Sequence, residues 1–136
     1  TMTNREAFAA VALAAVACDG TLGREEAHAL RRQLEYRSLY RDSSEAEMGE
    51  LFDQLLTVMR GSGVEGLIDQ ALPELNIVQK ESALAVAAHL VHADRKVTGD
   101  ERDFLQRLAE SINLPDGEAG MIVRAIEALN RDSLGD

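Results

Sequence analysis

Two acidic turns contain the residues of the chain that are best suited to bind a cation. In the first turn, Glu26 follows Asp19 after seven residues, and in the second, Glu101 follows Asp94 at the same spacing. We expect each Asp to end one helix and each Glu to lie in the first turn of the next. A short turn would then bring the two carboxylates within roughly 10 Å of each other. Hard cations such as Ca²⁺, Mg²⁺ or Mn²⁺ bind several oxygen ligands of this kind, so all four carboxylates are candidate metal ligands.

The same acidic residues also fit a purely structural role. Thr98 and Glu101 form a capping-box pattern, in which each side chain accepts a hydrogen bond from the other residue's backbone amide. Asp19 and Gly20 are an ordinary turn pair. An Asp at a helix C-terminus lies at the unfavourable end of the helix dipole, however, so Asp19 needs a local partner. A cation site and a set of helix caps therefore stay open as alternatives.

The histidines and the cysteine give weaker chemical signals. His89 and His92 are spaced to share a helix face near Asp94, but no third and fourth zinc ligand is evident in the sequence, so we expect ordinary helix residues. Cys18 is the single cysteine, which excludes an intrachain disulfide. We expect it to act as a small buried hydrophobic residue. The neighbouring Asp19 carboxylate should raise the pKa of its thiol and make it a poor nucleophile.

Charge and motifs exclude several classes of function. The chain has 14 Lys and Arg against 24 Asp and Glu, for a net charge of −10. Such a field repels nucleic acid and anionic membrane surfaces and favours cations and basic proteins. The sequence has no glycine-rich phosphate loop, nucleophile elbow or zinc-protease helix motif. The apolar run 7–18 is too short to span a membrane and is not followed by a cleavage site, so we expect a cytoplasmic protein.

Helices must position the acidic turns. The chain is 46% apolar but only 4% aromatic, which is typical of closely packed helices with a core of small aliphatic side chains. Hydrophobic periodicity predicts an all-α, single-domain bundle over residues 1–136, with about seven helices and no strand. The predicted helices cover about residues 5–18, 24–39, 44–60, 64–71, 77–93, 98–113 and 121–129.

The sequence contains an internal repeat. A shift of 75 residues aligns VACDGTLGREE with VHADRKVTGDE, so that Asp19 meets Asp94 and Glu26 meets Glu101. The helices before these turns, 5–18 and 77–93, are both rich in Ala and apolar on nearly all sides. We therefore expect two duplicated helix–acidic turn–helix halves around a pseudo-two-fold axis, with these two helices buried and close together.

The stretches AAVACDGTLGREEAHALRRQL and AAHLVHADRKVTGDERDFLQRLAESINLP resemble the TerB-like family of tellurite-resistance proteins. That family is similar to the N-terminal domain of membrane-anchored DnaJ-like co-chaperones. The resemblance implies an all-helical fold, a bacterial stress or metal-resistance context, and acidic turns that hold metal ions, with no established catalytic activity. The family's acidic positions fall on Asp19, Glu26, Asp94 and Glu101. The sequence departs from the family at Arg95, where Gly is common, and this cation could satisfy the Asp94 carboxylate.

We therefore expect a non-catalytic stress or tellurite-resistance module. It would bind a divalent cation (Ca²⁺, Mg²⁺ or Mn²⁺) or a partner protein through the paired acidic turns. The expected partner is a basic or membrane-associated protein, without nucleic-acid binding and without direct insertion into a membrane. The alternatives are a metal-dependent enzyme that uses clustered carboxylates and a pure protein-interaction scaffold.

Overall fold

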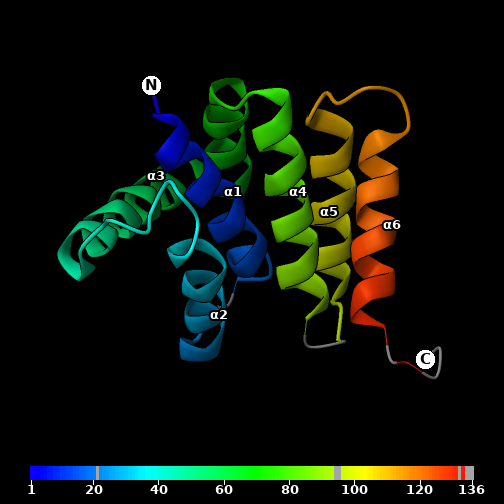
Figure 1. Ribbon diagram of the computed structural model, residues 1–136, viewed down its shortest axis with the longest axis horizontal. Helices are drawn as coiled ribbons and strands as arrows, with labels where there is room; N and C mark the ends of the chain where they lie inside the picture. Colours follow the sequence, from blue (N-terminus) through cyan, green and yellow to red (C-terminus); the bar gives the residue numbers. More distant parts are fainter. Residues whose placement is uncertain (21, 94–95, 132, 134–136) are drawn as a thin grey trace.

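A computed structural model describes residues 1–20, 22–93, 96–131 and 133, and these residues form helices but no strand (Figure 1). The all-α prediction is therefore confirmed. The helices of this part of the chain are α1 (Asn4–Ala17), α2 (Arg24–Glu35), α3 (Glu45–Ala71), the short 3₁₀ helix η1 (Leu72–Glu74), α4 (Ile77–His92), α5 (Gly99–Ser111) and α6 (Glu118–Asn130).

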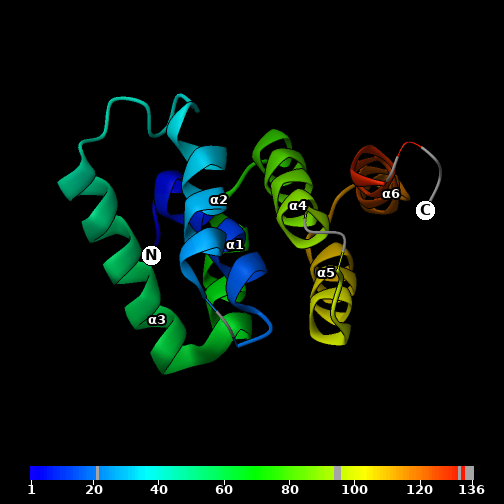
Figure 2. The same ribbon diagram turned by 90° about the horizontal axis from the view of Figure 1, so that it is seen from below.

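Helix α1 forms the centre of the hydrophobic core. It begins with a capping box between Thr3 and Glu6, and every residue from Ala7 to Ala17 is buried. Figure 2 shows α1 enclosed by α2, α3 and α4. Its many alanines leave room for neighbouring helices to approach closely. Helix α4 is also largely buried and packs directly against α1, which confirms the prediction that these two Ala-rich helices lie together.

The packing of the helices around the acidic turns repeats in the two halves. Each buried helix contacts the amphipathic helix that follows it, α1 with α2 and α4 with α5. Each also contacts the amphipathic helix of the other half, so that α1 packs on α5 and α4 packs on α2. This exchange of partners is what two duplicated halves produce when they pack around a pseudo-two-fold axis.

Helix α3 joins two of the helices that the sequence predicts as separate, so there are six α-helices in the described residues instead of about seven. The predicted break at 61–63 is present as a bend, because Gly63 has φ 73° and ψ 178° within the helix. That combination of angles is open essentially only to glycine. The bend turns the second half of α3 (64–71) toward α1 and α5 (Figure 2).

Helix α2 ends at Glu35, four residues before the predicted end at Leu39. The chain turns here because Tyr40 enters the core, where it is only 2% exposed. Its hydroxyl donates a hydrogen bond of 2.6 Å to the backbone carbonyl of Arg5, and the Arg5 side chain donates in return to the carbonyl of Leu39. These contacts hold the segment after α2 against the start of α1.

Helix α6 lies at the edge of the bundle and packs mainly on α4 (Figure 1). It has no fully buried residue, and Met121 and Leu129 on its outer face are exposed. Of the helices in the described parts of the chain, none has the length and apolar character needed to cross a membrane.

Candidate functional site

The first acidic turn places its two candidate carboxylates in different surroundings. Asp19 follows the C-cap of α1, Cys18. Glu26 lies in the first turn of α2 and folds back over Gly23, the N-cap residue. Both Glu26 carboxylate oxygens are 3.2 Å from the point that a β-carbon at Gly23 would occupy. The Glu26 carboxylate thus lies where a capping-box acid lies, although Gly23 has no side chain to complete the box.

The second acidic turn starts α5 with a complete capping box. The Thr98 hydroxyl accepts a hydrogen bond of 3.1 Å from the Glu101 amide, and the Glu101 carboxylate accepts one of 3.0 Å from the Thr98 amide. The structural role predicted for these two residues is therefore confirmed. Asp94, the other candidate ligand of this turn, lies outside the described residues, as does Arg95.

The thiol of Cys18 lies near carboxylates of both acidic turns. Burial raises the pKa of its thiol to about 12, together with the negative charges of Glu101, Asp19 and Asp100. The sequence predicts a buried Cys18, but its side chain is only half-buried because it lines a surface groove. Its thiol donates a hydrogen bond to the carbonyl of Ala15. Three carboxylates from two turns that lie far apart in the sequence therefore act on one thiol. These carboxylates belong to different halves, at the end of α1 and at the start of α5. They come close to the same thiol because α1 packs on α5.

The raised pKa favours the poor nucleophile that the sequence predicts, although burial and not the neighbouring Asp19 is the largest cause. A pKa of about 12, against an ordinary value of 9.0, leaves roughly a thousandfold less thiolate at neutral pH. We expect a disulfide reagent such as dithionitrobenzoate to react far more slowly with Cys18 of the folded chain than with the free thiol of glutathione. The rate of Cys18 modification should keep rising above pH 9, whereas the rate for an ordinary thiol levels off there. A fast reaction that is unchanged when the chain is unfolded in urea would contradict this environment.

The described carboxylates do not form a ready-made metal centre. Within residues 1–20, 22–93, 96–131 and 133, no three His, Cys, Asp or Glu side chains are grouped so that they could hold a metal ion. One oxygen of Glu101 is already used by its capping box. Asp94 lies outside these residues, so the metal role predicted for Asp19, Glu26, Asp94 and Glu101 stays a prediction.

An acidic groove of about 450 Å³ begins at Cys18 and runs between the second half of α3 and α5. Its floor is apolar, with Phe104 and Leu108 buried, and carboxylates line its sides. Arg107 is the basic side chain of the described lining and forms an ion pair with Glu65. The groove is lined by Cys18, Val64, Glu65, Ile68, Asp69, Asp100, Phe104, Arg107, Leu108, Glu110 and Ser111.

The sequence of α5 contains a signal for one wall of this groove. Asp100, Phe104, Leu108 and Ser111 recur at helical spacing, so one face of α5 carries an apolar stripe with an acidic start. The partner of that stripe could not be found in the same way, because it depends on the bend at Gly63.

The histidines occupy ordinary helix positions, as expected. His89 forms a hydrogen bond of 3.1 Å through Nδ1 with the side-chain amide of Asn130, which ties α4 to α6. His92 lines a different groove, between α5 and α6.

The model of the family described as tellurite resistance protein TerB matches residues 5–125, which includes both acidic turns and the acidic groove. No curated protein and no solved structure matches the chain.

Proposed function

The chain belongs to the family of the tellurite resistance protein TerB, and on that premise we propose that it is a non-catalytic module that binds a basic segment of a partner protein in its acidic groove. The observation that carries the proposal is the lining of this groove, in which an apolar floor is flanked by carboxylates from α3 and α5. Asp100, from the second acidic turn, lines the groove together with Cys18 and adds negative charge to that end.

Charge favours a cationic occupant. In the described lining, Glu65, Asp69, Asp100 and Glu110 stand against Arg107, which forms an ion pair with Glu65, so negative charge is in excess. All four of these acidic residues are exposed, so lysine or arginine side chains of a partner can reach them. The net charge of −10 attracts such a partner over a longer distance and speeds its association.

Shape favours an amphipathic segment of a protein over a free polyamine or ion. The floor of the groove is made by apolar residues of two helices, including Phe104, Leu108 and Ile68. An amphipathic helix binds such a groove by placing its apolar face on the floor, while its charged flanks contact the rim. An enzyme built on clustered carboxylates would instead need a cleft with an open metal position.

Binding of a model peptide tests this proposal. A short, fluorescein-labelled amphipathic peptide of leucine and lysine should bind the protein with a rise in fluorescence anisotropy. Asp69→Asn and Asp100→Asn should each weaken binding by about twofold to fivefold, because each removes one exposed charge pair. A peptide with glutamate in place of lysine should not bind.

Asp53→Asn is the matched control for these variants. Asp53 is exposed on the first half of α3 and does not line the groove. Its substitution changes the net charge by the same amount, so it reports attraction by overall charge alone. Equal weakening by Asp53→Asn and the groove variants would contradict binding in the groove.

The divalent-cation hypothesis is tested separately by thermal melting with millimolar Ca²⁺, Mg²⁺ or Mn²⁺. A cation that binds only the folded chain raises the melting temperature. A site within the first turn would be lost in the double variant Asp19→Asn with Glu26→Gln. A site formed by carboxylates of both halves would be lost in Asp19→Asn with Asp100→Asn and kept in Glu26→Gln alone. Melting that does not respond to any cation would leave the acidic turns as helix caps and peptide contacts.

A further inference from the structure

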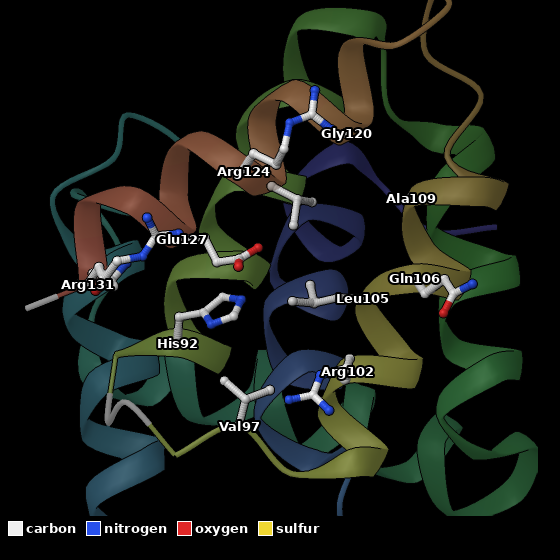
Figure 3. A pocket seen from close by; sticks show the side chains of 12 residues that line it. His92, Val97, Arg102, Leu105, Gln106, Ala109, Gly120, Arg124, Glu127 and Arg131 are labelled. Carbon is white, nitrogen blue, oxygen red and sulfur yellow. The ribbon is translucent and has the colours of Figure 1, made fainter. Parts of the chain in front are cut away.

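A second groove lies on the opposite face of α5, and its charge is reversed. It has a volume of about 580 Å³ and separates α5 from α6 (Figure 3). It exists because α6 packs mainly on α4 and only slightly on α5. Leu105 forms part of its floor and is buried, while Val97, Ala109 and Val123 line it as half-buried apolar residues.

Arginines surround this floor. Arg102 comes from α5, Arg124 from α6 and Arg131 from the C-cap of α6. Figure 3 shows Arg102 and Arg124 at opposite ends of the groove, with His92 and Glu127 pointing toward its middle. Among the described residues that line the groove, three arginines against one glutamate give a positive charge, although the whole chain has a net charge of −10.

The three guanidinium groups are not used by the fold of the described residues. The ion pairs Arg31–Glu45 and Arg107–Glu65 both lie outside the groove and involve none of these three arginines. Arg102, Arg124 and Arg131 are all exposed, so they are open to a ligand. A guanidinium group forms paired, charge-assisted hydrogen bonds with carboxylate, sulfonate or phosphate oxygens.

We propose that the groove between α5 and α6 binds a small amphipathic anion, an organic carboxylate or phosphate with an apolar body. The volume of about 580 Å³ is in the ordinary range for small-ligand sites. The apolar floor holds the body of the ligand, and the arginines at the rim bind its anionic group. This site is distinct from the acidic groove, because the two lie on different faces of α5 and share no lining residue.

Two dyes that differ by one charged group test the proposal. Anilinonaphthalene sulfonate has an apolar aromatic body and an anionic group, and phenylnaphthylamine has the same body without the charge. The sulfonate should bind with a rise in fluorescence and phenylnaphthylamine more weakly. The double variant Arg102→Gln with Arg124→Gln should weaken sulfonate binding by about tenfold, because charge-assisted hydrogen bonds are lost. Glu127→Gln should strengthen it.

The matched control is the double variant Arg41→Gln with Arg60→Gln. Both arginines are exposed and lie outside the groove, so the change in net charge is the same. The control should bind the sulfonate nearly as the unmodified protein does, and phenylnaphthylamine binding should be equal in all variants. Failure of the sulfonate to bind, equal affinity for the two dyes, or equal weakening in both double variants would each overturn the proposal.

Discussion

Replacing Leu84 by alanine should lower the free energy of unfolding by about 2–5 kcal/mol, the range measured for deletion of a fully buried leucine side chain. Leu84 lies in α4 and is 0% exposed. Because α4 packs against both α1 and α6, the cavity left by the substitution would be surrounded by residues that other contacts hold in place. The neighbours could therefore relax only partly, which places the loss within this range. Chemical denaturation followed by circular dichroism measures it.

The matched control is Leu129→Ala in α6, where the same side chain is 72% exposed. This substitution removes little buried surface, and the free energy of unfolding should change by no more than about 0.5 kcal/mol. Similar losses at the two positions would mean that α4 is not the buried helix described here.

Two glycine substitutions only two residues apart should have opposite effects. Gly63→Ala should destabilise the protein by about 1–3 kcal/mol, because φ 73° with ψ 178° is a conformation that alanine rarely adopts. Gly61→Ala should stabilise it by about 0.5–1 kcal/mol, because Gly61 has ordinary helical geometry and alanine is the better helix former. An added β-carbon meets no atom within 4 Å at either position, so steric contact does not obscure the backbone effect.

Thermal or chemical unfolding of both glycine variants gives the comparison. Gly63→Ala should also weaken binding of the leucine–lysine peptide, because the bend at Gly63 positions the α3 wall of the acidic groove. Stabilisation by both substitutions would show that α3 can straighten and that the bend is not fixed by Gly63.

Local composition explains which parts of the fold could be predicted from the sequence. An Ala-rich helix that is apolar on all sides has to be buried, so the central positions of α1 and α4 follow from their residues alone. The capping box at Thr98 and Glu101 is equally local, since both partners lie within one helical turn. The family follows from residues around the two turns, and the family match extends it over residues 5–125.

Long-range packing explains what the sequence did not reveal. The spacing of Asp19 and Glu26 predicts a pair within one turn, and this pair stays a prediction. The sequence did not reveal that Cys18 of the first half and Asp100 of the second half line the same groove. Which half supplies the neighbouring carboxylate depends on how the halves dock, and no pattern within either half encodes that. The acidic groove shares this property, because it lies between α3 and α5, which are separated in the chain. The metal role of Asp19, Glu26, Asp94 and Glu101 stays a prediction.

Because α6 lies at the edge of the bundle, we expect it to unfold before the other helices. A helix without a fully buried residue, attached mainly to α4, can detach while the α1–α4 core remains intact. Its amide protons should therefore exchange with solvent through local openings of lower free energy than global unfolding. An anion that bridges α5 and α6 would close these openings and slow exchange along the whole helix. The fraction of molecules in which α6 is docked on the rest of the bundle would then depend on the concentration of the bound anion.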